Sequence, residues 1–99
     1  MVRVIYRWQV EPEQFEAFRS AWRRVTDQIH ERVEGALGSA LLRSCETESE
    51  VLTIAKWDSL AAWKRFWGAA DPAQMQALRQ HGIRLSAEAF EVIEDRTRP

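Results

Sequence analysis

Apolar and mixed positions alternate along the start of the chain, and this repeat of two indicates a β-strand. The even positions form a strongly apolar face: Val2, Val4, Tyr6, Trp8 and Val10. The odd positions mix arginines with a single isoleucine. We expect the even face to pack beneath helices, because it is the more apolar of the two. The mixed odd face is then expected to meet a partner subunit.

A helical repeat follows this strand. Glu11, Pro12 and Glu13 can open a helix, because proline suits the first turn and acidic residues there favour the helix dipole. Apolar residues then recur every three or four positions, which predicts one long amphipathic helix that stops near Gly35. The stripe consists of Phe15, Phe18, Trp22, Val25, Ile29 and Val33.

The next segments predict two strands joined by a short polar loop. Residues 36–45 read as a strand in which Gly38 marks a bulge or a close approach of another backbone segment. Residues 46–50 form the loop and residues 51–57 the third strand, antiparallel to the second. A fourth strand is expected over residues 87–93, followed by a frayed tail at residues 95–99.

Residues 56–67 carry an unusual aromatic load at the corner between the third strand and a second helix. Asp58 and Ser59 can cap this helix, and Trp63 and Trp67 share one of its faces, with Phe66 beside them. The helix should break at residues 68–72. Asp71 and Pro72 should then open a further helix that ends or kinks near Gly82.

The order β-α-β-β-α-β in a single domain over residues 1–99 predicts an α+β, ferredoxin-like fold. Four antiparallel strands carry the helices on one face. Because the other face is too apolar to remain exposed to water, we expect two sheets to pack face to face in a homodimer.

The composition of the chain limits the kinds of partner that it is expected to bind. A net charge of −1 argues against nucleic-acid binding. The single cysteine, with no signal peptide and no long apolar run, predicts a cytoplasmic protein without a membrane association. The sequence also shows no glycine-rich phosphate loop, no clustered metal ligands and no local nucleophile triad.

Three segments together resemble the antibiotic biosynthesis monooxygenase (ABM) family: the first strand running into EPEQF at residues 11–15, GSALLR at residues 38–43, and KWDSLAAW at residues 56–63. The resemblance covers nearly the whole chain and implies a dimeric α/β barrel. It also implies a small aromatic ligand, since the family includes oxygenases of polycyclic phenols that use neither metal nor flavin. Haem-degrading enzymes belong to the family as well.

The haem-degrading branch has an asparagine on the first strand, a tryptophan after the third strand and a histidine further on. Phe66 or Trp67 could match the tryptophan and His81 the histidine, but the chain contains no asparagine. We therefore expect no cofactor, with haem binding through His81 kept as an open alternative.

A cofactor-free oxidation of a phenol, anthrone or quinol needs a dry aromatic slot, a proton acceptor and a donor or cation near the developing oxyanion. His81 is the expected catalytic proton carrier, because histidine exchanges protons near neutral pH. Tyr6 is the expected donor, and Arg84 shares a face with His81 if the helix continues past Gly82. The expected slot residues are Trp8, Trp63, Phe66 and Trp67.

Two other interpretations compete with the hypothesis that the chain is an enzyme. In one, the chain is a non-catalytic dimeric module that binds a small aromatic ligand or haem. In the other, the tryptophans of the chain fill the pocket themselves. An open cavity between helices and sheet would favour the enzyme or the binding module over a pocket filled by the chain's own tryptophans.

Overall fold

The computed structural model describes residues 1–69 and 73–98, and these form the predicted ferredoxin-like domain. In chain order the elements are β1 (Val2–Gln9), the short 3-10 helix η1 (Pro12–Gln14), α1 (Phe15–Arg32), β2 (Ala36–Arg43), β3 (Glu50–Trp57), α2 (Leu60–Ala69), α3 (Ala73–Arg79) and β4 (Ile83–Glu91). In this part of the chain, no helix is long and apolar enough to cross a membrane.

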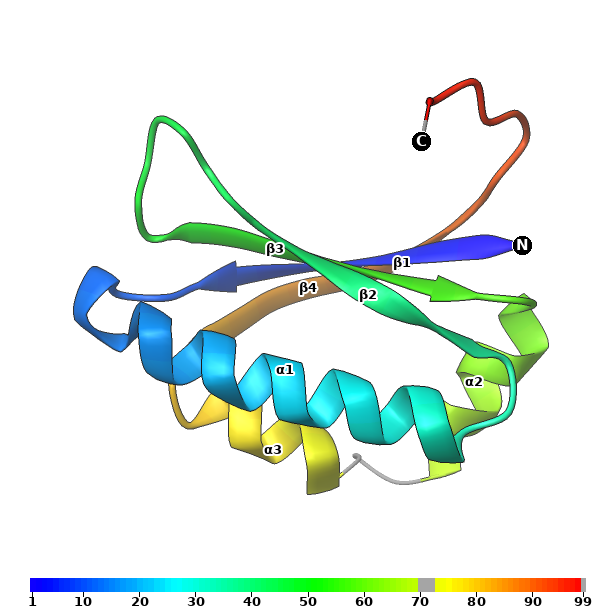
Figure 1. The fold of residues 1–99 in the computed structure, drawn as a ribbon, viewed down its shortest axis with the longest axis horizontal. Helices are drawn as coiled ribbons and strands as arrows, with labels where there is room; N and C mark the ends of the chain where they lie inside the picture. The colour runs from blue at the N-terminus through cyan, green and yellow to red at the C-terminus, as the bar shows by residue number, and fades with distance from the viewer. Residues whose placement is uncertain (70–72, 99) are drawn as a thin grey trace.

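The four strands form one antiparallel sheet in the order β2-β3-β1-β4. Figure 1 shows the helices together on one side of this sheet, with α1 running along its length. The opposite side is uncovered. This arrangement confirms the predicted fold class.

The even positions of β1 form the centre of the core, as predicted. Val4, Trp8 and Val10 are fully buried, and Tyr6 is 5% exposed. These side chains meet the apolar stripe of α1, in which Phe18 and Val25 are also buried. The Trp8 and Phe18 rings pack edge to face with their centroids 5.1 Å apart.

Two predicted backbone features are confirmed. Gly38 lies at a register shift between β2 and β3 and has a φ of +108°, as expected for a bulge. Ser59 caps α2, because its Oγ accepts a hydrogen bond from the Ala62 N–H at 3.1 Å.

The fourth strand differs from the prediction. It begins at Ile83, four positions earlier than expected, and ends at Glu91. The prediction relied on the local apolar pattern, whereas pairing decides the boundary: Ile83 lies opposite Gln9, so β4 uses the whole length of β1. The predicted helix start at Asp71 and Pro72 lies outside the described residues.

The early start of β4 also corrects the expectation for Arg84. α3 ends at Arg79, so no helix passes Gly82. Arg84 reaches the helical layer from the sheet instead, opposite Trp8 and beside a bulge in the β1–β4 pairing.

Gly35 fixes the corner at which α1 turns into β2. Its φ is +90°, and a Cβ there would lie 2.6 Å from the Ala62 Cβ and 2.7 Å from the Asp58 Oδ1. Its carbonyl accepts a hydrogen bond from the Asp58 N–H at 2.9 Å. The glycine therefore lets the α1–β2 turn contact the β3–α2 corner directly.

We predict that Gly35→Ala lowers the free energy of unfolding by about 2–3 kcal/mol, through backbone strain and overpacking. Gly38→Ala is the matched control, because its φ is similar but nothing lies within 4 Å of the added Cβ. The control should lose roughly 1 kcal/mol. Urea unfolding measures both values, and equal losses would contradict the proposed contact.

Candidate functional site

A cavity lies between the second half of α1 and the sheet, with α2 and α3 closing its far side. Its empty volume is about 480 Å³, counting its opening to solvent, yet the centre of a water molecule could move through only about 50 Å³ of it. The cavity is thus narrow as well as open. Its lining residues are Tyr6, Trp22, Val25, Thr26, Ile29, His30, Ala36, Gly38, Ser39, Thr53, Ala55, Lys56, Trp57, Phe66, Met75 and Leu78.

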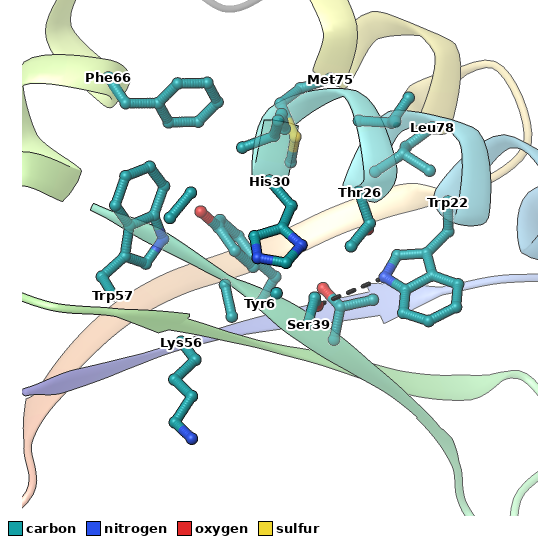
Figure 2. A pocket seen from close by; sticks show the side chains of 16 residues that line it. Tyr6, Trp22, Thr26, His30, Ser39, Lys56, Trp57, Phe66, Met75 and Leu78 are labelled. Atoms are coloured by element: carbon teal, nitrogen blue, oxygen red, sulfur yellow. Dashed lines mark hydrogen bonds between the residues drawn. The ribbon is translucent and has the colours of Figure 1, made fainter. Parts of the chain in front are cut away.

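Aromatic rings form the two ends of this cavity. Figure 2 shows Trp57 and Phe66 at one end and Trp22 at the other. The Trp57 and Phe66 rings contact each other, with centroids 5.4 Å apart. Met75 and Leu78 of α3 add apolar surface, so the site offers ring faces to a ligand.

Three hydroxyl groups in the lining each accept a hydrogen bond from an indole N–H. The Trp63 Nε1–H donates to the Tyr6 hydroxyl at 3.0 Å, and the Trp8 Nε1–H donates to the Thr53 Oγ1 at 3.1 Å. The Trp22 Nε1–H donates to the Ser39 Oγ at 3.4 Å, the bond drawn in Figure 2.

These bonds leave the hydroxyl hydrogens free. Within residues 1–69 and 73–98, none of the three hydroxyls donates a hydrogen bond to a protein acceptor. A hydroxyl whose oxygen already accepts one bond can still donate its own hydrogen. The cavity therefore presents hydrogen-bond donors among aromatic walls.

Burial changes the acidity of the Tyr6 hydroxyl. Burial raises its pKa to about 12, although the hydrogen bond from Trp63 and the positive charge of Arg84 both act to lower it. The phenol is consequently protonated throughout the physiological range and acts as a donor rather than as a base.

A cationic and aromatic cluster supports Tyr6 from behind the cavity. The Trp67 ring lies 5.6 Å from the Tyr6 ring and stacks on Trp63 at 5.7 Å. The Arg84 guanidinium lies over Trp67, 4.7 Å from its ring centroid, and the Nη1 atom of Arg84 is buried without a hydrogen-bond partner among the described residues. This cluster holds the tyrosine in place and puts a positive charge near it.

The predicted site residues other than His81 thus divide between the cavity and its support. Tyr6 and Phe66 line the cavity. Trp63, Trp67 and Arg84 form the supporting cluster, and Trp8 lies fully buried beneath Thr53.

His81 lies apart from these residues. Its Nδ1 is 3.2 Å from the Gln14 Oε1, at the junction of η1 and α3, and it is not among the lining residues. The structure therefore brings Tyr6 and Arg84 into one cluster and leaves His81 outside it.

Another histidine lies at the cavity. His30, in the last turn of α1, lines the cavity, and Figure 2 shows its imidazole pointing into it. His30 also remains exposed to solvent. Lys56 also contributes to the lining, but its side chain points away from the rings in Figure 2.

The sequence carried partial signals for the other residues that we missed. Thr53 belongs to the inward-facing set of β3, with Val51 and Trp57. Ser39 follows the bulge at Gly38. Polar residues in those places suggested a cavity, but nothing in the sequence paired them with tryptophans.

The described part of the chain contains no group of three or more His, Cys, Asp or Glu residues that could hold a metal ion. Among curated protein sequences, none matches this chain.

Solved structures share the fold over nearly the whole chain. SnoaB of Streptomyces nogalater, a cofactor-independent oxygenase, superposes with a TM-score of 0.75 at 23% identity, covering 98% of this chain and 97% of its own. A protein of Deinococcus radiodurans gives a TM-score of 0.74 at 19% identity, with 100% and 99% coverage. Rv0793 of Mycobacterium tuberculosis gives 0.69 at 16% identity, with 97% and 98% coverage.

These likenesses agree with the ferredoxin-like architecture, and the sequence carries the family signature directly. The profile of the antibiotic biosynthesis monooxygenase family matches residues 1–80, which include β1, α1, β2, β3 and α2. The chain belongs to the antibiotic biosynthesis monooxygenase family.

Proposed function

We propose that the protein is a cofactor-free monooxygenase that oxidises a planar phenol, anthrone or quinol in the cavity beneath α1. The observation that carries this proposal is the set of three indole-anchored hydroxyls, on Tyr6, Ser39 and Thr53, inside a narrow aromatic cavity. The fold that the chain shares with SnoaB, a cofactor-independent oxygenase, supports the reaction class.

The shape of the cavity favours a flat ligand. Its aromatic ends are set by Trp22 and by the Trp57–Phe66 pair, and its free interior is small. Ring faces stack well on an aromatic substrate. A planar polycyclic ligand would therefore be favoured over a globular one of the same size.

The free donors favour a ligand rich in oxygen acceptors. A phenolate, enolate or quinone oxygen can accept hydrogen bonds from hydroxyls that an apolar molecule would leave unsatisfied. Donors held in position in a water-poor site also stabilise negative charge that develops on a substrate oxygen. Tyr6 is the best placed of them, because Arg84 adds a positive charge nearby.

The reaction needs only the substrate and dioxygen. In an anthrone, the CH₂ carbon loses a proton, and the resulting anion passes one electron to dioxygen. Superoxide and the substrate radical combine to form a carbon–oxygen bond. Loss of the remaining proton with cleavage of the O–O bond gives a carbonyl and one water: R₂CH₂ + O₂ → R₂C=O + H₂O. Dioxygen takes all four electrons, so no outside reductant enters.

We assign the role of proton acceptor to His30 rather than to His81. His30 faces the cavity, whereas His81 lies outside the lining and next to Gln14. A general base has to reach the proton that it removes, so position decides between the two histidines.

We further propose that the chain acts as a homodimer through the uncovered face of the sheet. Ile5 and Ile54 lie side by side at its centre, and the large apolar residues Leu42, Leu85 and Phe90 are exposed on the outer strands. A cluster of exposed apolar residues commonly marks a protein interface.

Oxygen uptake with dithranol, an anthrone, tests the enzymatic role. We expect protein-dependent uptake with formation of the quinone, and a roughly 10- to 100-fold lower kcat/KM in Tyr6→Phe, which removes one donor to the oxyanion. His30→Ala should lower kcat, whereas the matched variant His81→Ala should leave it unchanged. Dithranol that binds without added oxygen uptake would contradict the proposal, as would a rate that depends on His81 alone.

The ionisation of Tyr6 can be followed without interference from other phenols, because the chain contains one tyrosine. Tyrosinate absorbance should stay low at pH 10, where an ordinary tyrosine is half ionised, and rise with a midpoint at about 12. In Arg84→Gln the midpoint should move higher, because the lost charge favoured the phenolate.

The same shift links stability to pH. Because the pKa of Tyr6 is higher in the folded than in the unfolded chain, its protonation contributes to the free energy of unfolding. This contribution is complete below pH 10 and is lost as the pH rises from 10 toward 12. The loss amounts to about 3 kcal/mol. A titration midpoint near 10 in protein that circular dichroism shows to be folded would contradict the burial of Tyr6.

Size-exclusion chromatography tests the dimer. The wild-type chain should elute at twice the mass of one chain. Ile54→Glu, at the centre of the uncovered face, should elute as a folded monomer, because burying an unpaired charge at an interface is costly. Leu60→Glu, on the exposed side of α2, is the control and should remain dimeric. A monomeric wild-type protein at micromolar concentration would rule out the interface.

A further inference from the structure

A second concavity lies outside the cavity, between the first half of α1 and the end of β2. It is lined by four side chains of α1, at positions 15, 19, 22 and 23, and by two of β2, at positions 41 and 43. We name it the arginine groove. Its residues are Phe15, Arg19, Trp22, Arg23, Leu41 and Arg43. The centre of a water molecule could move through about 310 Å³ of it, which is at the lower end of the range of small-molecule sites.

The groove concentrates positive charge on a chain whose net charge is −1. Three of its six lining residues are arginines, and none is acidic. Arg19 approaches one carboxylate, Glu16, at 3.9 Å, and both side chains are exposed to solvent, so this pair neutralises little. Arg23 and Arg43 have no carboxylate within 4.0 Å among the described residues.

Apolar and aromatic surface forms the rest of the groove. Phe15, Trp22 and Leu41 are partly buried and pack against the core. The Arg43 guanidinium lies over the Phe15 ring, 4.4 Å from its centroid. This stacking holds the guanidinium in place while its edge remains free to form hydrogen bonds. The groove thus combines an oriented cation with a surface for a ring.

We propose that the arginine groove is a second ligand site and that it takes a planar aromatic anion, such as an arene carboxylate. The carboxylate would bind between Arg23 and Arg43, and the ring would lie against Trp22 and Leu41. Arginine suits this role because its planar fork matches a carboxylate. The proposal does not depend on oxygenase activity, since it rests on a different set of contacts.

Trp22 relates the groove to the cavity. It lines both, and its indole N–H donates to Ser39 inside the cavity. The two sites nevertheless offer different chemistry, because the cavity presents neutral hydroxyl donors and the groove presents guanidinium groups. Charge should therefore decide which of the two sites a planar ligand enters.

Isothermal titration with naphthoate, the aromatic anion, and naphthamide, its neutral counterpart, tests the proposal. We expect saturable naphthoate binding at least 10-fold tighter than naphthamide binding and weaker at high salt. In the double variant Arg23→Gln/Arg43→Gln the naphthoate Kd should rise at least 10-fold. Arg24→Gln is the matched control, because Arg24 neighbours Arg23 on α1 but does not line the groove, and its Kd should equal that of the wild type.

Three results would overturn the proposal. The first is an absence of saturable naphthoate binding to the folded wild-type protein. The second is equal affinity in the double variant and in Arg24→Gln. The third is naphthoate binding that Tyr6→Phe abolishes and the double variant does not, which would place the anion in the cavity. Circular dichroism on each variant shows that a lost signal is not lost folding.

Discussion

Three indole N–H groups in this small domain find their acceptors in hydroxyl oxygens, and the site depends on that pairing. A buried indole N–H without an acceptor would cost about 1–3 kcal/mol. Trp63, Trp8 and Trp22 avoid this cost by donating to Tyr6, Thr53 and Ser39. Two of these bonds join residues 45 and 57 positions apart in the chain, and the third joins α1 to β2. The same contacts that stabilise the core therefore also fix the hydroxyls in place.

The pairing has a chemical consequence. Because the hydroxyl oxygens accept from tryptophans, their hydrogens are available to something else, and the described residues offer no acceptor. Burial keeps Tyr6 protonated, with a pKa of about 12, so this donor stays a donor at any physiological pH. A narrow, aromatic, donor-lined cavity suits a planar ligand rich in oxygen acceptors better than it suits a purely apolar ligand.

Periodicity predicted most of the fold. The even positions of β1 and the stripe of α1 are buried as expected, because both patterns report which face of an element meets the core. The predicted start of β4 was wrong because strand pairing with β1, rather than the local apolar pattern, sets that boundary. Arg84 consequently reaches Tyr6 from the sheet and not from a helix.

The candidate site was less accessible to sequence reasoning. Tyr6 and Phe66 were identified, since an inward tyrosine and an aromatic-rich helix both point to a cavity. The partner hydroxyl of Trp8 lies 45 positions away, and that of Trp63 lies 57 positions away. No local pattern encodes such contacts. His30 and His81 are both histidines near helix ends, and only the packing of α1 over the cavity distinguishes them.

A crystal structure of the protein with anthraquinone tests the central claim most directly, because this planar quinone cannot be oxidised further in the proposed reaction. The account predicts its rings between Trp22 and the Trp57–Phe66 pair, with one carbonyl oxygen within hydrogen-bond distance of the Tyr6 hydroxyl. Anthraquinone bound elsewhere, or bound in the cavity with both carbonyl oxygens facing away from Tyr6, Ser39 and Thr53, would contradict it.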